Sequence, residues 1–215
     1  MVLFLAMPAL AEFKLLEEYG FKLLPYGLAK TENEALEIAE RIGYPIAMKI
    51  ISPQASHKTD VGGVKINIKN SLNVKLTFKE FQEIALASNM VLDGILIQKM
   101  ARKGLELIIG GKKDEQFGHV IVLGLGGVYV EIFRDITARL CPINKNDVKE
   151  MVDELKSHPL IYGARGKKGI SMKYLEEILI KTCKFLQSED IKELDLNPVI
   201  FDEKGCDIVD VRFTK

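Results

Sequence analysis

A single lysine inside an apolar run constrains this chain most. Lys49 is the only charged residue of Ile46–Ile51, whose apolar character predicts a buried strand. A strand that places one cation among apolar neighbours must direct it toward a polar or anionic partner, because an unpaired buried charge is unfavourable. A second strand is predicted at Val64–Ile68 as the hairpin partner or neighbour of the first. The alternative is a surface hairpin whose lysine extends its ammonium group into water.

The segment between these strands carries the other signs of phosphate chemistry. Gly62 and Gly63 lack a Cβ, so the backbone can approach a ligand closely and direct N–H groups at an anion. His57 lies among Ser, Pro, Thr and Asp residues that predict a loop. A histidine there is either a surface residue or a nucleophile, since neutral imidazole can accept a phosphoryl group near pH 7. A cation, a glycine turn and an imidazole together predict a phosphate-binding site.

Composition limits the class of partner. The chain has 215 residues, 47% hydrophobic and 28% charged, with zero formal net charge and a pI near 6.8. General electrostatic attraction to nucleic acid or acidic membranes is therefore not expected. No segment approaches the roughly 20 apolar residues of a membrane span. We take Met1–Ala6 as an upstream extension or a first apolar turn, with Met7 as an alternative start and a signal peptide as the other alternative.

The three cysteines are far apart in the sequence. Cys141, Cys183 and Cys206 are odd in number, and no pair has the spacing of metal ligands. We therefore expect buried, unpaired thiols and no disulfide framework. This usage fits a reducing, cytoplasmic location.

The remaining pattern predicts a mixed α and β protein. Thr31 and Glu34 form a capping-box pattern that opens a helix ended by Gly43 and Pro45. Further helices are expected at Leu10–Tyr19, Leu76–Ser88, Asn146–Leu155 and Met172–Leu186. Further extended segments are expected at Phe21–Leu28, Ile95–Met100, Leu105–Gly110, Val120–Leu123, Val128–Phe133, Ile191–Leu196 and Asp207–Phe213. Adjacent, antiparallel-looking strand pairs indicate α+β layers and not a doubly wound sheet.

Two further groups of residues could bind a ligand in this central part. Glu106 could accept hydrogen bonds from ribose hydroxyls, although a solvated glutamate is the usual explanation. Leu123–Val128 is rich in glycine but fails the dinucleotide fingerprint, because a strand and not a helix is predicted after it. We interpret it as a glycine-lined surface for a substrate or phosphate. Charged residues that could line it, or simply lie at the surface, are Glu131, Arg134, Asp135 and Arg139.

Alternation near the C-terminus predicts a cluster of oxygen ligands. Glu193, Asp195 and Asn197 lie on one face of a predicted strand, with Leu194 and Leu196 on the other. After the turn at 202–205 the chain returns, so Asp210 can lie beside Asn197. Such oxygen ligands suit Mg²⁺, although a polar sheet edge would give the same pattern. His119 and His158 have turn-like contexts, and we expect structural or surface roles for them.

Together these residues resemble the β subunit, or ATP-grasp domain, of NDP-forming acyl-CoA synthetases, the ADP-forming acetate–CoA ligase type. The resemblance covers Pro8–Arg212 and rests on several motifs in the same order. They are Gly43-Tyr-Pro, Lys49-Ile-Ile-Ser-Pro, His57-Lys-Thr-Asp-Val-Gly-Gly-Val64, Ile108-Ile-Gly110, Asp114-Glu-Gln-Phe-Gly118, Gly124-Leu-Gly-Gly-Val128, Gly163-Ala-Arg-Gly166 and Asp195-Leu-Asn-Pro198.

The resemblance implies an ATP-grasp fold over residues 8–215, with subdomains at about 20–100 and 101–215 that clasp a Mg-nucleotide. By position, Lys49 matches the strand lysine on nucleotide phosphate, and Gly62 and Gly63 match the glycine turn over the phosphates. The segment Gln98, Lys99 and Met100 resembles the adenine-facing hinge, and Glu106 the ribose-binding carboxylate. Asn197 and Asp210 match magnesium ligands of the related succinyl-CoA synthetase β subunit. His57 matches a loop histidine that carries phosphate.

The implied activity is that of an ADP-forming acid–thiol ligase, with ATP or ADP and Mg²⁺ bound. It requires an α subunit with the CoA-binding and ligase domains, in an α₂β₂ assembly. Phosphate would pass from acyl phosphate to an α-subunit histidine, then to His57, then to ADP. The alternatives are an ATP-grasp carboxylate–amine ligase, which has no role for His57, and a non-catalytic nucleotide-sensing subunit. The sequence determines neither the acyl group nor the choice between ADP and GDP.

Overall fold

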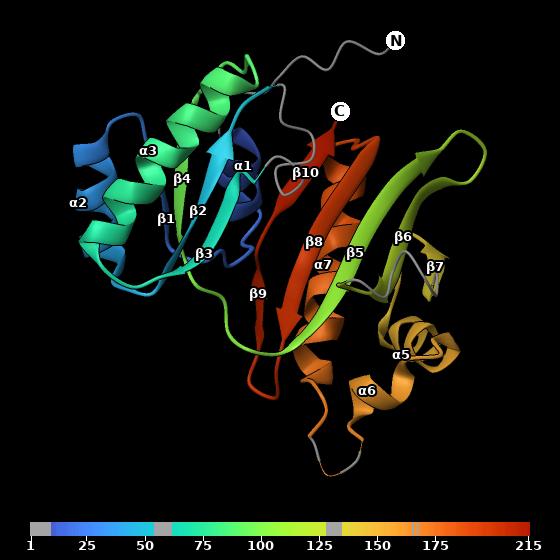
Figure 1. Cartoon of the computed structure of the whole chain (residues 1–215). Coiled ribbons are helices and arrows are strands. Elements are labelled where there is room, and N and C mark those ends of the chain that lie inside the picture. Colours follow the sequence, from blue (N-terminus) through green and yellow to red (C-terminus); the bar gives the residue numbers. More distant parts are fainter. Residues whose placement is uncertain (1–9, 54–61, 128–134, 165, 167) are drawn as a thin grey trace. The chain divides into compact units, whose positions relative to one another are not determined.

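The computed structural model describes residues 10–53, 62–127, 135–164, 166 and 168–215. These residues form two compact units (Figure 1). Unit 1 contains Leu24–Met100, and unit 2 contains Glu12–Leu23 and Ala101–Lys215. Within the described ranges, none of the helices has the length and apolar content needed to span a bilayer.

Unit 1 is built on a four-stranded antiparallel sheet. Its strands are β1 (Tyr26–Ala29), β2 (Ile46–Ile51), β3 (Val64–Ile68) and β4 (Gly94–Lys99), in the order β1-β4-β2-β3. The predicted hairpin partners β2 and β3 do pair, with Lys49 opposite Val64. The structure also inserts β4 between β1 and β2, which pairing of sequence neighbours would not have predicted.

Two helices cover one face of this sheet (Figure 1). Helix α2 (Glu32–Ile42) begins with the predicted capping box, in which Thr31 Oγ1 accepts from the Glu34 amide and the Glu34 carboxylate accepts from the Thr31 amide. Helix α3 (Ser71–Ala87) begins five residues before the predicted start, because Asn70 caps its first turn through the Asn73 amide. Their apolar faces meet Met48, Ile50 and Ile97 in a single core.

Unit 2 is built on a larger antiparallel sheet, whose strand order is β10-β8-β5-β6-β7, with β9 paired to β8. The strands are β5 (Leu105–Asp114), β6 (Gly118–Leu125), β7 (Ile136–Leu140), β8 (Glu193–Phe201), β9 (Cys206–Ile208) and β10 (Val211–Thr214). The expected single strand Asp207–Phe213 is wrong, because the chain leaves β8 after β9 and rejoins it as β10. Strand β7 was not predicted, and the strand expected at Val128–Phe133 lies outside the described residues.

The core of unit 2 lies between the sheet and helix α7 (Met172–Ser188). A Cβ at Gly111 would come within 2.5 Å of Leu186, so glycine lets this helix pack directly on β5. Helix α1 (Ala11–Glu18) also belongs here: Tyr19 and Phe21, just after it, make edge-on ring contacts with Phe185 at 5.0 and 5.9 Å. The smaller helices are α5 (Lys145–Glu154) and α6 (His158–Tyr162), the second of which was not predicted.

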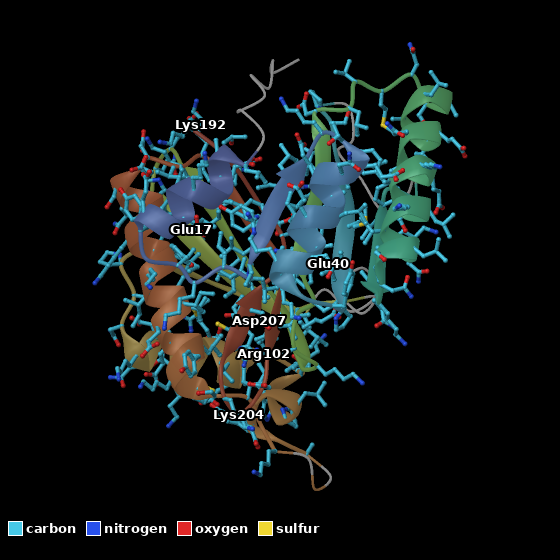
Figure 2. The ribbon with its side chains drawn as sticks, turned by 90° about the vertical axis from the view of Figure 1, so that its left-hand side faces the viewer. Glu17, Glu40, Arg102, Lys192, Lys204 and Asp207 are labelled. Atoms are coloured by element: carbon cyan, nitrogen blue, oxygen red, sulfur yellow. A yellow bond between two sulfur atoms is a disulfide. The ribbon has the colours of Figure 1, made fainter. Side chains whose placement is uncertain are left out.

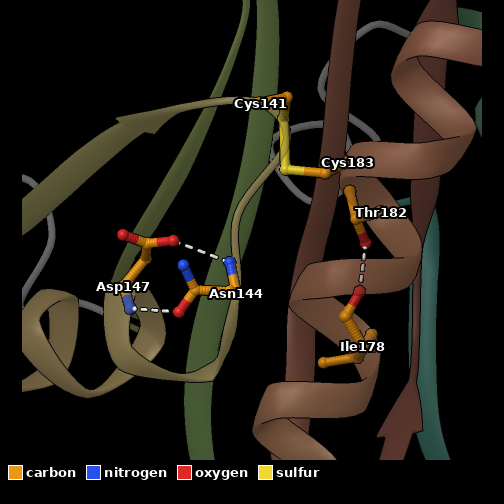
Figure 3. The surroundings of a disulfide bond; sticks show 6 residues. All are labelled: Cys141, Asn144, Asp147, Ile178, Thr182 and Cys183. Atoms are coloured by element: carbon orange, nitrogen blue, oxygen red, sulfur yellow. Dashed lines mark hydrogen bonds between the residues drawn. A yellow bond between two sulfur atoms is a disulfide. The ribbon is translucent and has the colours of Figure 1, made fainter.

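A disulfide corrects the expectation of unpaired thiols. Cys141, just after β7, is bonded to Cys183 on α7, with a Cα–Cα distance of 5.5 Å (Figure 3). Cys206 is free. The prediction failed because an odd number of distant cysteines excludes only complete pairing, and the fold brings residues 42 positions apart into contact.

Candidate functional site

Lys49 lies in the middle of the unit 1 sheet. Its neighbours Met48 and Ile50 point into the core under α2 and α3, so alternation places Lys49 on the other sheet face. The residue is only 5% exposed. The alternative of a solvated surface lysine is therefore wrong, and this sheet face holds a buried cation suited to an anionic group.

The glycine pair that follows has the backbone expected of a tight turn. Gly62 has φ = +70°, a left-handed conformation that favours glycine. The Gly63 carbonyl accepts from the Ile50 amide at 2.8 Å, which fixes the turn to the strand carrying Lys49. His57 lies outside the described residues, so its role as a phosphoryl carrier stays a prediction.

The segment Gln98–Met100 lies at the end of β4, and the backbone N–H groups of Lys99 and Met100 are already hydrogen-bonded. The Lys99 amide donates to the Pro25 carbonyl at 2.8 Å, and the Met100 amide to the Pro45 carbonyl at 3.3 Å. The Lys99 ammonium donates to the carbonyls of Gly43 and Tyr44, at 2.7 and 3.2 Å, at the end of α2. Lys99 is thus held by its own unit, and a base contact at this segment must use other groups.

Glu106 and the glycine-rich strand end are brought together in unit 2. The Gly126 amide donates to the Glu106 carbonyl at 2.7 Å. A Cβ on Gly126 would lie 2.9 Å from that carbonyl, and one on Gly127 would lie 3.4 Å from the Glu106 carboxylate. The sequence suggested these as separate candidates. In the structure the glycines provide the room in which the exposed Glu106 side chain lies.

Two charged residues expected near the glycine-rich segment are engaged elsewhere. Asp135 is 7% exposed, and its carboxylate accepts from the Lys156 and Ser157 amides at 2.8 Å each. Arg139 donates to the Glu154 carboxylate, at 3.0 Å from Nη1. Both therefore stabilise the β7–α5–α6 region. The other two, Glu131 and Arg134, lie outside the described residues.

The predicted oxygen cluster forms at the meeting of β8 and β10. Leu194 and Leu196 are buried while Glu193, Asp195 and Asn197 are exposed, as the alternation predicts. The backbone N–H of Asn197 donates to the backbone carbonyl of Asp210 at 3.3 Å, so these residues lie side by side. Although the Asp195 residue is exposed, neighbouring atoms partly desolvate its carboxyl group, and this raises the pKa of the carboxyl; Arg212 opposes this rise, and the Asp210 carboxylate adds to it.

The donor set is compatible with Mg²⁺ on chemical grounds. Among the described residues, no group of three or more His, Cys, Asp or Glu side chains forms a metal site. Asn197 and Asp210 are instead one amide and one carboxylate, the sparse protein ligation typical of Mg²⁺ when nucleotide phosphates and water complete its shell.

One charge cluster was not anticipated. Arg102, between the Gln98–Met100 segment and Glu106, donates to Asp202 and Asp207 at 2.9 Å each. Figure 2 labels Arg102 and Asp207. Its backbone amide also donates to Asp207, at 2.8 Å. The hydrogen bond to Asp207 is the main reason that the pKa of Arg102 is raised. No local sequence signal pairs residues a hundred positions apart, so only the fold reveals this anchor of the segment before β5.

The two described histidines behave as expected. His158 Nδ1 lies 2.8 Å from the Leu155 carbonyl, a local contact at the start of α6. His119 is the second residue of β6, and its Nε2 lies 3.8 Å from the Asp190 carboxylate. Neither lies in a cluster of metal-ligating side chains.

Comparison with known proteins places these features in a family. The ATP-grasp domain family matches residues 6–214. The chain is 40% identical over 202 residues to acetate–CoA ligase [ADP-forming] I subunit beta of Pyrococcus furiosus, covering 93% of this chain and 87% of that subunit. It is 41% identical over 199 residues to acetate–CoA ligase [ADP-forming] I of Archaeoglobus fulgidus, but there 92% of this chain spans only 29% of the longer relative.

A solved structure gives the same answer for the fold. The chain matches the dinucleotide-forming acetyl-coenzyme A synthetase 1 of Ca. Korarchaeum cryptofilum, in complex with coenzyme A and Mg-AMPPCP, with a TM-score of 0.82 and 36% identity. The match covers 96% of this chain and 91% of that one. That structure is described as having its phosphohistidine segment pointing towards the nucleotide-binding site. The expected ATP-grasp fold is confirmed, and the chain belongs to the ATP-grasp domain family, among the β subunits and domains of ADP-forming acetate–CoA ligases.

Proposed function

We propose that this chain is the nucleotide-binding β component of an ADP-forming acyl-CoA synthetase. With its partner it would interconvert acyl-CoA, ADP and phosphate with a carboxylic acid, ATP and CoA. The observation that carries the proposal is Lys49, a buried lysine on the sheet face opposite the helices, in a chain of this family. Such a cation is suited to a phosphate group that is bound without water around it.

The step assigned to this chain is phosphoryl transfer between a histidine and ADP. In the direction of ATP synthesis, the P–N bond of phosphohistidine 57 breaks. A β-phosphate oxygen of ADP forms the new P–O bond. The imidazole ring takes up one proton from water as the P–N bond breaks, so His57 leaves as neutral imidazole. Lys49 would offset the negative charge on the transferred group, and the amides at Gly62 and Gly63 would orient the phosphates.

The other residues would hold the substrate in place for this step. Gln98, Lys99 and Met100 would border the base, and Glu106 would accept hydrogen bonds from the ribose hydroxyls. Asn197 and Asp210 would bind Mg²⁺, whose bound charge stabilises the phosphate oxygens during transfer. Each of these roles is carried over from the resemblance.

A partner is required for the complete reaction. We propose an α subunit that supplies the CoA-binding and ligase domains and a first phosphohistidine, in an α₂β₂ assembly. The relatives support this in two forms, a separate β subunit in Pyrococcus furiosus and a chain more than three times longer in Archaeoglobus fulgidus. The chain alone would bind nucleotide without forming acyl-CoA.

The test is phosphoryl labelling of the chain. We would incubate it with γ-labelled ATP and Mg²⁺, with and without the α subunit of an ADP-forming acetate–CoA ligase. Wild type should acquire label that is stable to base and labile to acid, as phosphohistidine is, and His57→Ala should not. His158→Ala is the matched control, because it removes a histidine held by a local backbone contact.

The outcomes separate the candidate functions. Label on wild type and on the His158 variant, but not on the His57 variant, supports the synthetase. ATP binding without label, even with the partner, contradicts the relay and leaves the nucleotide-sensing subunit. Ligation of an amine by the isolated chain would support the carboxylate–amine ligase instead.

A further inference from the structure

We propose that helix α3 is a docking surface for a second copy of this chain, through antiparallel pairing with α3 of that copy. The surface is the exposed stripe of α3, which consists of Leu72, Leu76, Lys79, Glu83 and Leu86. The inference goes beyond the proposed function, because it uses none of the residues assigned to the nucleotide. It holds for any of the candidate activities.

The first step is the position of the exposed stripe on the helix. Its successive members are four, three, four and three residues apart, the spacing at which the side chains of one helix line the seam with another. With about 3.6 residues in a turn, the stripe lies on the side of α3 away from the core. The buried residues of α3, on the opposite side, are Val74, Thr77, Phe78, Phe81 and Ala85.

The second step is the apolar content of the exposed stripe. Leu72, Leu76 and Leu86 are 63%, 59% and 83% exposed. A single exposed leucine is ordinary, but three along one stripe form an apolar face that a second helix would cover. The neighbouring helix α2 shows the usual pattern for a solvated helix, because its exposed residues are all polar or charged. They are Asn33, Glu34, Glu37, Glu40 and Arg41.

The third step is the charge pattern, which makes the exposed stripe complementary to itself. Lys79 and Glu83 lie between the leucines, and neither forms an ion pair within the described residues. If a two-fold axis passes midway between them, Lys79 faces Glu83 of the second copy, and Glu83 faces its Lys79. The same axis brings Leu76 opposite Leu86, and Leu86 opposite Leu76. Contacts between two identical copies require this kind of reciprocity.

The charges also determine the direction of the pairing. In a parallel pair, Lys79 would face Lys79 and Glu83 would face Glu83, and facing like charges are unfavourable. In the antiparallel pair, Leu72 lies over the residues that follow α3 in the second copy, where Val91 is 58% exposed. Each leucine of the exposed stripe thus has an apolar partner. This self-complementarity favours a second copy of the chain over an unrelated partner.

The test measures the mass of the full chain by sedimentation equilibrium without nucleotide. Two helices of 17 residues form a contact smaller than a standard interface. We therefore expect a weak dimer, with a dissociation constant of roughly 10–100 µM. Loading concentrations on both sides of this range should show a monomer that converts to a dimer.

Charge-reversal variants assign the dimer to the exposed stripe. Lys79→Glu and Glu83→Lys each place like charges opposite one another, so each should weaken the dimer by about 10-fold or more. Mixed in equal amounts, the two variants should form a heterodimer, because an acidic stripe then faces a basic one. Both positions are exposed, so the melting temperatures should stay as in wild type. Lys149→Glu, an exposed position of α5, is the matched control and should dimerise as wild type does.

The outcomes separate this inference from the alternatives. A wild-type chain that stays monomeric would overturn it, and so would a dimer that is equally strong in Lys79→Glu. Absence of a heterodimer in the mixture would also overturn it. If wild type is monomeric and Lys79→Glu weakens binding to the α subunit, the exposed stripe belongs to that partner instead. Dimerisation with no phosphoryl label would contradict the proposed function alone, since the mass is measured without nucleotide.

Discussion

Gly126 lies directly against Glu106, with its amide 2.7 Å from the Glu106 carbonyl and no room for a side chain between them. An added Cβ would be 2.9 Å from the Glu106 carbonyl carbon and oxygen. Gly126→Ala should therefore displace the start of β5 and lower stability by about 1–3 kcal/mol, as overpacking does. It should also weaken ADP binding if Glu106 contacts the ribose.

The control for this prediction lies on β5, the strand that contains Glu106. A Cβ at Gly110 would meet its nearest neighbours at 3.6 and 3.7 Å, which are ordinary contacts. Gly110→Ala should leave the denaturation midpoint nearly unchanged, and denaturant unfolding with ADP titration would measure both variants. A Gly126→Ala protein as stable as Gly110→Ala would show that β5 accommodates the methyl.

Lys49 should contribute to ADP binding, and Lys65 on the neighbouring strand β3 provides the control. Lys49→Met should lower ADP affinity by roughly 10- to 100-fold, since hydrogen bonds to charged groups contribute about 1.5–3 kcal/mol. Lys65 lies on β3 opposite Met48 of β2, so its side chain is on the helix-covered face of the sheet. There it forms an ion pair with Glu80 at 2.9 Å. Lys65→Met should leave the dissociation constant for ADP unchanged. A similar loss in both variants would assign the effect to net charge.

The oxygen cluster at β8 and β10 should set the magnesium requirement. Asp210→Asn removes one proposed ligand charge and should raise the Mg²⁺ concentration needed for half-maximal ADP binding, with a smaller change in metal-free affinity. Glu203→Gln, at the exposed turn between β8 and β9, is the control. An unchanged magnesium requirement in Asp210→Asn would remove this residue from the metal site.

The disulfide between Cys141 and Cys183 should contribute measurably to the stability of unit 2. It closes a stretch of 42 residues, and bridges of this kind typically contribute about 2–4 kcal/mol. Cys183→Ser, or reduction with dithiothreitol, should lower the denaturation midpoint, and the reductant should have no further effect on the variant. Burial raises the pKa of the Cys206 thiol to about 11, so this thiol is almost entirely protonated at neutral pH. As the control, Cys206→Ser should keep the wild-type response to reductant.

The stability of the β7–α6 connection should depend on pH through Asp135. Burial alone would raise the pKa of this carboxyl, but hydrogen bonds from Ser157 and Lys156 outweigh it and lower the pKa below its usual value of 3.8. A lowered folded-state pKa contributes stability at pH values above 3.8, and this is lost as pH falls through the folded pKa. Asp135→Asn should therefore be destabilising at pH 7 by about 1–3 kcal/mol and much less so near pH 2.

Urea denaturation at both pH values would measure this difference. Glu115→Gln, at the exposed hairpin turn between β5 and β6, should have no effect at either pH. An equal loss for Asp135→Asn at pH 7 and pH 2 would mean that side-chain shape, and not the charge of the carboxylate, matters at position 135.

Local signals predicted most of the elements. Thr31 and Glu34 gave the start of α2, and the apolar runs gave the bounds of β2 and β3 without error. Asp210 was expected beside Asn197 because a short turn must return the chain along the strand that it has just left, and the hydrogen bond between them confirms it. Where a cap, a period or a turn acts within a few residues, the sequence carries the information.

Elements and contacts that depend on distant partners were not predictable in this way. Strand β4 lies between β1 and β2, and β7 completes the edge of the second sheet, because of packing that no local pattern records. The Cys141–Cys183 bond, the pairing of Arg102 with Asp207 and the approach of Gly126 to Glu106 join residues 42, 105 and 20 positions apart. The assigned roles of Lys49, His57, Gln98 and the proposed metal ligands came from the order of motifs and stay predictions.

The division of unit 2 into two stretches of sequence has a consequence for synthesis on the ribosome. Leu24–Met100 is complete as soon as it leaves the exit tunnel, and the sheet of unit 1 needs no later residue. Helix α1 emerges earlier, yet the aromatic residues that follow it pack on Phe185, which is made near the end. Its buried face, with Phe13 and Leu16, must remain uncovered while most of the chain is translated. Nascent chains halted before residue 185 should thus be the ones that chaperones for exposed apolar segments recognise.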